Sequence, residues 1–207
     1  MVVKKKLRTE IRQKLSALDP TVAHAKSMAA CLKLVAQPEF AKARSIMIYL
    51  PMSGEVDIGP IALRGWQDQK TIAAPKLAWD QRHMIPVEIR SLETGLVKTD
   101  RPAVPNLREP ATGEPVPVEM LDLVIVPALA YDRKGNRLGR GAGFYDRFLA
   151  QSHFHGVSVG LAFHEQVLDS LPVQENDIPV NMLVTDEEVL RFNIKPPSDD
   201  RKSGGRS

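Results

Sequence analysis

Residues 123–147 read LVIVPALAYDRKGNRLGRGAGFYDR, and this stretch decides the fold. Its first four residues, 123–126, are all apolar, and an apolar run without alternation is typical of a strand buried on both faces of a parallel sheet. A basic loop that contains Gly139, Gly141 and Gly143 follows, and a helix is predicted over 144–152. In an open α/β sheet, ligands bind outside the carboxyl ends of the strands. The glycine loop is therefore the first place to expect a site.

Strands and helices alternate along the rest of the chain. Short strands are predicted at Ser45–Leu50 and Thr71–Ala74, each ended by the proline that follows it. Further strands are predicted at 84–89, 157–162 and 182–184, and further helices at 58–66 and near Gln166. Because Pro86 cannot donate to a ladder, the strand that contains it is expected at a sheet edge. The alternation predicts a single three-layer α/β domain over residues 1–194, with a mainly parallel sheet flanked by helices.

The first helix is predicted to carry an apolar stripe and a cationic row. The stripe repeats every three or four residues and consists of Val3, Leu7, Ile11, Leu15 and Leu18. Lys4, Arg8 and Arg12 each lie one residue further on, about 100° around the helix axis. We therefore expect a row of positive charge along the edge of the buried face.

A second helix is expected directly afterwards, with Asp19 as its N-cap and Pro20 as its first residue. Its core face is predicted to consist of Met28, Leu32 and Val35. Cys31 is the only cysteine of the chain, which excludes an internal disulfide and a thiolate metal site. We expect Cys31 to serve in packing.

Composition excludes several classes of protein. With 43% hydrophobic and 26% charged residues in a length of 207, the chain has the make-up of one globular domain. Its longest near-continuous apolar run, residues 123–131, is far short of the roughly 20 residues that a membrane-spanning helix needs. No apolar segment follows the basic N-terminus, so a secretory signal is not expected. We expect a cytoplasmic monomer.

The excess of positive charge lies at the two ends of the chain. Residues 1–14 carry a net charge of +5 and residues 195–207 carry +2, so the body between them carries −4 out of a total of +3. This distribution does not indicate a nucleic-acid-binding surface. Residues 195–207 are expected to form a disordered tail. Five prolines between 102 and 117 predict an extended loop there.

The loop after the buried strand is suited to binding phosphate. Its glycines let backbone N–H groups approach an anion closely, the following helix contributes its positive end, and Arg137 and Arg140 add full charges. The spacing matches neither GxGxxG nor GxxxxGK(S/T), so neither a dinucleotide-binding fold nor a Walker A loop is indicated. A flexible turn with solvated arginines is the alternative. Asp146 is either an acid favoured by the helix dipole or a ligand for Mg²⁺ beside the phosphates.

These residues resemble the 5-formyltetrahydrofolate cyclo-ligase family, also called 5,10-methenyltetrahydrofolate synthetases. The likeness is close over residues 126–132 and 135–146, and in all it covers roughly residues 3–190. Shorter similar segments lie, in order, at Lys4 with Arg8, 49–50, 55–57, 109–110, 163–166, 171–172, 176–177 and 184–185. The segment with glycines and arginines is highly specific, and the order of the others adds weight to it.

The resemblance implies an enzyme that uses ATP and Mg²⁺ to cyclise 5-formyltetrahydrofolate to 5,10-methenyltetrahydrofolate, with release of ADP and phosphate. The γ-phosphoryl group would be transferred to the formyl oxygen, and N10 of the substrate would then attack the activated carbon. Phosphoryl transfer depends mainly on positioning and on charge compensation. The partners expected from the resemblance are therefore ATP and a reduced folate, and neither nucleic acid nor a membrane.

The resemblance also implies roles for individual residues at matching positions. ATP would be bound by Lys4, Arg8, Arg137, Leu138, Gly139, Arg140, Gly141, Ala142, Gly143, Phe144 and Tyr145. Among these, Arg140 and Tyr145 would be catalytic. Folate would be bound by Tyr49, Leu50, Glu55 and Met84, with the Glu55 carboxylate accepting hydrogen bonds from the pterin. Asp146 and Asp177 would hold Mg²⁺.

Other interpretations of the same residues stay open. Taken alone, Lys4 and Arg8 are solvated helix charges, Glu55 is an acid at a helix start and Asp177 is a turn residue. Phe144 stands where the family commonly has Tyr. The alternative functions are those of an ATP-binding relative that acts on another pterin or carboxylate substrate, or of a non-catalytic nucleotide- or RNA-binding protein.

Overall fold

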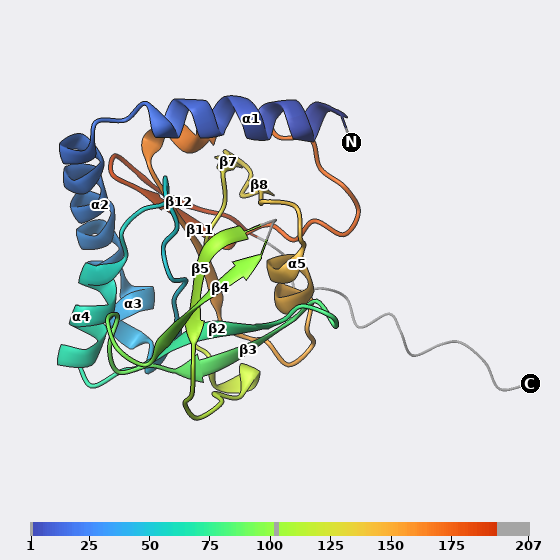
Figure 1. Cartoon of the computed structure of the whole chain (residues 1–207). Helices are drawn as coiled ribbons and strands as arrows, with labels where there is room; N and C mark the ends of the chain where they lie inside the picture. The colour runs from blue at the N-terminus through green and yellow to red at the C-terminus, as the bar shows by residue number, and fades with distance from the viewer. Residues whose placement is uncertain (1, 102–103, 194–207) are drawn as a thin grey trace, which may run out of the picture.

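A computed structural model describes residues 2–101 and 104–193, and a seven-stranded sheet runs through its centre (Figure 1). The strands lie in the order β12, β11, β9, β6, β1, β2, β3. Their bounds are β1 Ser45–Met47, β2 Thr71–Ala78, β3 His83–Glu88, β6 Leu123–Val126, β9 Val157–Ala162, β11 Met182–Thr185 and β12 Val189–Arg191. Neighbours from β11 to β2 are parallel, and the edge strands β12 and β3 are antiparallel. The predicted mainly parallel sheet is confirmed.

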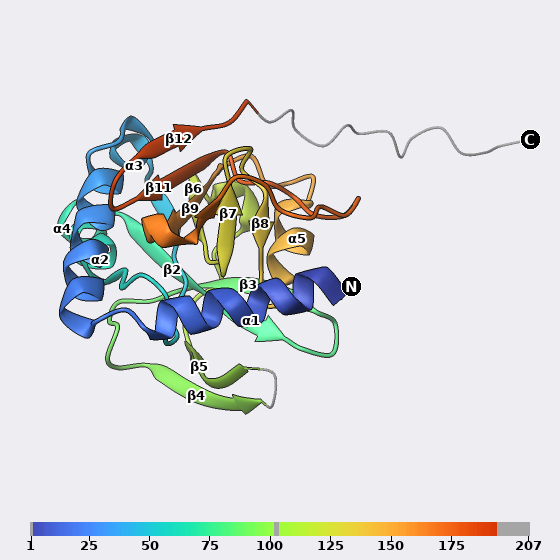
Figure 2. The ribbon, with the colours of Figure 1, turned by 90° about the horizontal axis from the view of Figure 1, so that it is seen from above.

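Helices lie on both faces of this sheet and complete three layers (Figures 1 and 2). One face carries α2 Pro20–Val35, α3 Pro38–Lys42 and α4 Gly59–Gln67, and the other carries α5 Phe144–Leu149. Successive side chains of a strand point to opposite faces, so each strand serves two cores. Within β6, Ile125 packs on the α2 side and Val124 on the α5 side, and both are fully buried. The predicted three-layer α/β architecture is confirmed.

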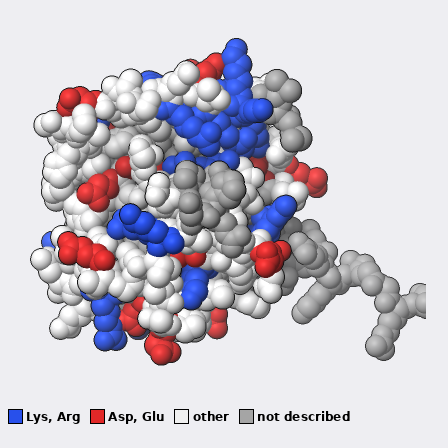
Figure 3. Space-filling view, in the orientation of Figure 1, with Lys and Arg blue, Asp and Glu red and all other residues white. Residues whose placement is uncertain are grey.

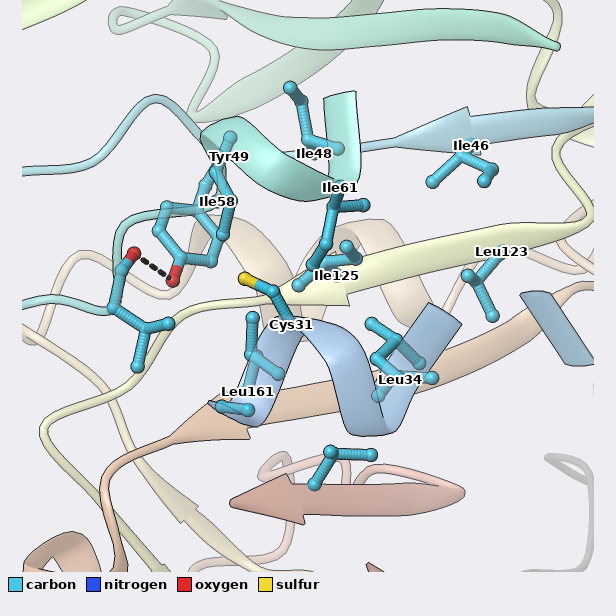
Figure 4. Packing of buried hydrophobic residues seen from close by; sticks show 14 of the residues in the cluster. Cys31, Leu34, Ile46, Ile48, Tyr49, Ile58, Ile61, Leu123, Ile125 and Leu161 are labelled. Atoms are coloured by element: carbon cyan, nitrogen blue, oxygen red, sulfur yellow. Dashed lines mark hydrogen bonds between the residues drawn. The ribbon is translucent and has the colours of Figure 1, made fainter. Parts of the chain in front are cut away.

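The core on the α2 side contains the single cysteine (Figure 4). Cys31 is fully buried, and its thiol donates a hydrogen bond to the carbonyl oxygen of Asp57 over 3.2 Å. Nearby, the Tyr49 hydroxyl donates to the carbonyl oxygen of Val56 over 2.8 Å. Burial raises the pKa of the Cys31 thiol to about 12. The packing role expected of Cys31 is confirmed.

The first helix, α1 Val2–Ser16, crosses one end of the molecule (Figure 2). Ile11 and Leu15 are buried, whereas Val3 is 67% exposed. The apolar stripe therefore anchors the C-terminal half of the helix. The N-terminal half extends toward α5 (Figure 2). The prediction that Val3 belongs to the buried stripe was wrong.

The cap of α2 is as predicted, but its buried face is not. The Asp19 carboxylate accepts hydrogen bonds from the N–H groups of Thr21 and Val22. Met28 and Leu32, expected in the core, are 36% and 62% exposed. The buried residues of α2 are Ser27, Ala30, Cys31 and Leu34. Val35 packs against the core as predicted, so the prediction was wrong only for Met28 and Leu32. α2 packs against α4 and β11 through this face.

Strands β1 and β2 end at residues other than the predicted ones. β1 ends at Met47 rather than Leu50, whereas β2 passes Pro75 and continues to Ala78. β1 pairs with β2 only as far as Ala73, so the missing N–H of Pro75 removes no ladder bond. On its other side Pro75 faces Pro86 of β3, which lies at the sheet edge as predicted. The prediction that Pro75 ends the strand was wrong.

The proline-rich stretch 102–117 contains a strand, although a loop was predicted. β4 Leu96–Arg101 and β5 Val104–Pro110 form a two-stranded antiparallel ribbon. Its prolines fall where few ladder bonds are needed: Pro105 lies where the register shifts, and Pro110 ends the strand. The ribbon packs against β2.

Short elements complete the chain. β7 Ala130–Asp132, β8 Arg137–Leu138 and β10 Val167–Leu168 form a small sheet, and single 3-10 turns span Val118–Met120 and His164–Gln166. α5 ends at Leu149, three residues before the predicted end, and the helix expected near Gln166 is one of these turns. The tail predicted at 195–207 lies outside the described residues. No helix in the described ranges is both long and apolar enough to cross a membrane.

Candidate active site

A cavity of about 750 Å³ opens at the carboxyl ends of the central strands. Its wall includes Leu50 just after β1, Leu77 near the end of β2 and Pro127 just after β6. Every residue that the sequence assigned to ATP, folate or Mg²⁺ lines it, namely Lys4, Arg8, Tyr49, Leu50, Glu55, Met84, the segment 137–146 and Asp177. Figure 3 shows Lys and Arg side chains gathered below α1. The fold thus brings together residues that the sequence separates by more than 170 positions.

The glycine loop forms one wall of this cavity between β8 and α5. Gly141 and Gly143 have φ angles of +113° and +69°, which side chains rarely adopt. Gly143 is the N-cap residue of α5. The Arg8 guanidinium lies against Gly141, where a Cβ would be 3.6 Å from its carbon atom. Glycine is therefore required here by the backbone conformation of the turn.

α1 brings two cations to the opposite side of the loop. Arg8 Nε donates a hydrogen bond to the carbonyl oxygen of Gly139 over 2.9 Å, and Lys4 Nζ donates to a carboxylate oxygen of Asp177. The Lys4 side chain is only 14% exposed. Two members of the predicted cationic row, Lys4 and Arg8, therefore line the cavity, whereas Arg12 is exposed outside it. The interpretation of Lys4 and Arg8 as solvated surface charges is wrong.

Acidic and basic groups of the cavity are joined in three ion pairs. These are Lys4 with Asp177, Arg137 with Asp146 over 2.7 Å, and Arg140 with Glu55 over 2.8 Å. The Arg137 and Glu55 side chains are 4% and 9% exposed, whereas their partners Asp146 and Arg140 are 24% and 26% exposed. Each of these two pairs therefore joins one buried member to a partner at the cavity surface. Each pair joins a cation predicted to bind ATP to a carboxylate predicted to bind Mg²⁺ or folate.

The two aspartates fit Mg²⁺ only together with further oxygen ligands. Besides its cation, Asp146 accepts a hydrogen bond from the N–H of Ile178, and Asp177 accepts one from the N–H of Gln174. Over the described ranges, no three His, Cys, Asp or Glu side chains gather as a metal site. Mg²⁺ in nucleotide sites commonly takes one or two carboxylates and completes its octahedron with phosphate and water oxygens. The donor set is therefore compatible with Mg²⁺ that arrives with a nucleotide.

Tyr145 lines the cavity, and its hydroxyl is buried. Its oxygen is inaccessible to solvent and has no hydrogen-bond partner among the described residues. Burial, followed by the nearby Glu55 charge, raises the pKa of Tyr145 well above its usual value. The hydroxyl therefore stays protonated at neutral pH and can donate a hydrogen bond to a ligand.

Sequence reasoning missed the apolar wall of the cavity. Pro75, Leu77 and Trp79 line it, and the Trp79 ring packs edge-on against Phe144 with centroids 5.0 Å apart and an interplanar angle of 83°. These residues follow the point where Pro75 was expected to end the strand. A prediction of one hairpin over 71–88 would have placed them beside Met84.

The β4–β5 ribbon was also missed as part of the site. Leu107, Arg108 and Glu109 line the cavity, yet no role was expected for them. The available signal was Glu109–Pro110, a segment that resembles the family but lay in a stretch predicted to be a loop. Asp57, which follows the cavity-lining Glu55, proves to cap the N–H of Gly59 at the start of α4.

Comparison with known proteins shows the family to which the chain belongs. The family model described as the 5-formyltetrahydrofolate cyclo-ligase family matches residues 1–186. The 5-formyltetrahydrofolate cyclo-ligase of Mus musculus is 31% identical, over 89% of this chain and 94% of the mouse protein. The enzyme of the same name from Escherichia coli K12 is 29% identical, over 88% of this chain and 100% of the bacterial protein.

A solved structure has the same fold. The 5,10-methenyltetrahydrofolate synthetase of Aquifex aeolicus superposes with a TM-score of 0.79 at 30% identity, over 97% of this chain and 98% of that protein. The match is thus spread over the whole fold. The chain belongs to the 5-formyltetrahydrofolate cyclo-ligase family.

Proposed function

We propose that this protein catalyses the ATP- and Mg²⁺-dependent cyclisation of 5-formyltetrahydrofolate to 5,10-methenyltetrahydrofolate, with release of ADP and phosphate. The observation that carries the proposal is that one cavity is lined by every residue expected to bind ATP, Mg²⁺ or folate. Membership of the cyclo-ligase family supports the same reaction. The protein's partners are small molecules.

The cations and the glycine loop hold the triphosphate in this proposal. Backbone N–H groups of the loop contact phosphate oxygens, and Lys4, Arg8, Arg137 and Arg140 compensate the charge that shifts during phosphoryl transfer. Asp146 and Asp177 hold Mg²⁺ that enters with ATP, and the ion supplies charge neutralisation to the phosphates. No dedicated protein base is needed for this step.

The apolar wall positions the folate for two successive displacements. In the first, the formyl oxygen attacks the γ-phosphorus and ADP leaves. In the second, the substrate's own N10 attacks the formyl carbon, the C–O bond breaks and inorganic phosphate leaves, while the N10 proton passes to solvent. Tyr145 donates a hydrogen bond to an oxygen of the transferring group, as expected of a hydroxyl with a raised pKa. Exclusion of water protects the activated intermediate from hydrolysis.

The test is the appearance of methenyltetrahydrofolate absorbance when the purified protein is mixed with 5-formyltetrahydrofolate, ATP and Mg²⁺. Omission of any one component should abolish the signal. If ATP binds and no product forms, the protein is a relative that acts on another substrate. Binding of RNA with a steep dependence on salt would instead support a nucleic-acid role.

A further inference from the structure

Arg147 is an arginine of the cavity wall to which the proposed reaction gives no role. It lies on α5 and lines the cavity. Its guanidinium donates hydrogen bonds through two different nitrogen atoms. Nε donates to the carbonyl oxygen of Arg82 over 3.0 Å, and Nη2 donates to the carbonyl oxygen of Ala142 over 2.6 Å. One side chain therefore joins two backbone segments that are far apart in the sequence.

The first of these segments is the glycine loop. Ala142 stands between Gly141 and Gly143, which both have positive φ angles. Glycines leave a backbone free to adopt many conformations, so contacts from outside the loop are needed to hold one of them. In a planar trans peptide the N–H points opposite to the carbonyl. The hydrogen bond from Arg147 to the Ala142 carbonyl therefore also fixes the direction of the Gly143 N–H.

The second segment is the turn between β2 and β3, residues 79–82, which ends at Arg82. Three residues in or beside this turn belong to the apolar wall of the cavity, namely Leu77, Trp79 and Met84. The strand β3 packs against α5 (Figure 1). The hydrogen bond from Arg147 to the Arg82 carbonyl attaches the turn to the same helix. It therefore holds the apolar wall at a fixed place relative to the glycine loop.

The value of this bridge lies in geometry more than in stability. Arg147 is exposed, so its hydrogen bonds should contribute little to the free energy of unfolding. Phosphoryl transfer requires the γ-phosphorus and the formyl oxygen to meet in line, and a misplacement of about 1 Å can lower a rate about 100-fold. In the proposed function, the triphosphate is held by the glycine loop and the folate by the apolar wall. These are the two segments that Arg147 joins.

We propose that Arg147 is a positioning residue that aligns the bound triphosphate with the bound folate. It acts through the backbone carbonyl groups of Ala142 and Arg82 and not through contact with either substrate. Its role thus differs from that of the other four cations of the cavity, which compensate phosphate charge. The inference rests on the proposed function, because it names the residue that aligns the two reactants of that reaction.

The kinetic test replaces Arg147 by Met, which keeps an unbranched side chain and removes both donors. We expect kcat to fall at least tenfold, while the KM values for ATP and for 5-formyltetrahydrofolate each change less than threefold. The melting temperature should shift by less than about 2 °C. Arg90→Met is the matched control, because the Arg90 side chain is 87% exposed and lies outside the cavity, and its kinetics should equal those of the parent protein.

A second variant separates the bridge from the charge. Arg147→Lys keeps the positive charge but has a single nitrogen atom in place of the planar fork, so we expect most of the loss in kcat to remain. An unchanged kcat in Arg147→Met would overturn the proposal. It would also be overturned by a rise in the KM for ATP alone that Arg147→Lys reverses, because Arg147 would then be a direct ligand of the phosphates.

Amide hydrogen exchange tests the bridge without any substrate. In Arg147→Met, peptides that cover residues 79–83 and 139–143 should both exchange at least threefold faster than in the parent protein, while those of β6 keep the parent's rate. Unchanged exchange, or faster exchange in only one of the two segments, would overturn the proposal. If the parent protein does not cyclise 5-formyltetrahydrofolate, the proposed function is wrong. If the parent is active and Arg147→Met has the same kcat, only the role of Arg147 fails.

Discussion

Arg140 and Glu55 illustrate how far single residues could be predicted. Their presence in the site follows from the glycine-arginine segment and from the resemblance, but their pairing does not, because 85 residues separate them in the chain. The same holds for Lys4 and Asp177. The resemblance to the family thus indicated which groups meet in the cavity. Which of them neutralise each other depends on the three-dimensional path of the loops.

Substitutions in the Arg140–Glu55 pair are expected to affect the free energy of unfolding and the affinity for ATP differently. Arg140→Ala leaves the Glu55 carboxylate buried without its cation, so we expect a loss of about 1–3 kcal/mol in the free energy of unfolding. Adding Glu55→Gln removes the stranded charge and should restore most of that stability. The affinity for ATP should fall at least tenfold in both variants.

Urea denaturation and ATP titration check this prediction separately. Arg133→Ala, at a half-exposed arginine outside the cavity, is the control and should change neither quantity appreciably. Unchanged ATP affinity in Arg140→Ala would reduce Arg140 to a structural partner of Glu55.

Asp146 predicts a dependence on Mg²⁺ concentration. Asp146→Asn keeps the shape of the side chain and removes the charge that would hold the ion, so the Mg²⁺ concentration for half-maximal rate should rise several-fold and the maximal rate should fall. A magnesium titration at saturating ATP measures both. The exposed Asp169→Asn is the matched control. A lower melting temperature with an unchanged magnesium titration would limit Asp146 to holding Arg137, and Asp177 would become the next candidate.

Secondary-structure elements were predicted best where one physical factor dominates. β6 and β9 have the predicted bounds, because an apolar run in a parallel sheet needs only burial. α2 begins at the predicted cap, yet its buried face consists of Ser27, Ala30, Cys31 and Leu34 and leaves Met28 and Leu32 exposed. The β4–β5 ribbon and the continuation of β2 were hidden by prolines whose missing N–H groups lie off the ladders.

Helix α1 is predicted to act through two of its charges. Lys4→Ala combined with Arg8→Ala should raise the KM for ATP at least tenfold and change that for folate less than twofold. Deleting residues 1–8 should have the same effect, because Ile11 and Leu15 still anchor the remaining turns. The double variant Lys5→Ala, Lys6→Ala serves as control. Equal increases for both substrates would leave α1 with a packing role only.

The contact between α3 and β12 predicts a dependence of stability on pH. The hydrogen bond from Arg191 lowers the pKa of Glu39 below its usual value. Glu39 therefore contributes stability above its unfolded pKa, and this contribution is lost as the pH falls through the lowered value in the folded state. Glu39→Gln should lower the melting temperature at pH 7 and have no effect at pH 2.

The size of this effect is expected to be less than about 1 kcal/mol, because the Arg191 side chain is half exposed and water screens the pair. High salt should reduce it further. Thermal unfolding at both pH values provides the measurement, with the exposed Glu119→Gln as reference. A difference that persists at pH 2 would show that Glu39 acts through packing instead of charge.

Two kinds of long-range contact hold the molecule together: the cores on the two faces of the sheet, and the contact of the N-terminal helix with the segment before β11. Each central strand contributes side chains to two cores, as its apolar run predicted. The N-terminal helix α1 lies over the cavity, and its Lys4 contacts Asp177 in the segment before β11. No local pattern encodes that contact. Since site residues come from both ends of the chain, we expect the cavity to form only in the complete fold.

The reactivity of the Cys31 thiol can be used to measure how often the whole fold opens. Cys31 is fully buried between α2 and the sheet, and its thiol pKa is raised to about 12, so a thiol reagent at pH 8 should not react with the native protein. Labelling should proceed at the rate of global unfolding and accelerate with urea. The S152C thiol, placed on an exposed loop, should react at once in the same protein. Rapid labelling of Cys31 without denaturant would mean that α2 detaches from the sheet locally.

In the three ion pairs, carboxylates of the cavity already neutralise the cations that are expected to bind phosphate. A small anion that approaches Arg137 or Arg140 competes with a carboxylate tethered at high effective concentration, and it leaves that carboxylate stranded when it wins. A nucleotide that carries both phosphate charge and a divalent cation can satisfy both members of a pair in one exchange. Inorganic phosphate alone should therefore inhibit weakly. The site should therefore distinguish a nucleotide with its divalent cation from inorganic phosphate by charge as well as by shape. Only the nucleotide complex brings a cation for the carboxylate that its phosphates displace.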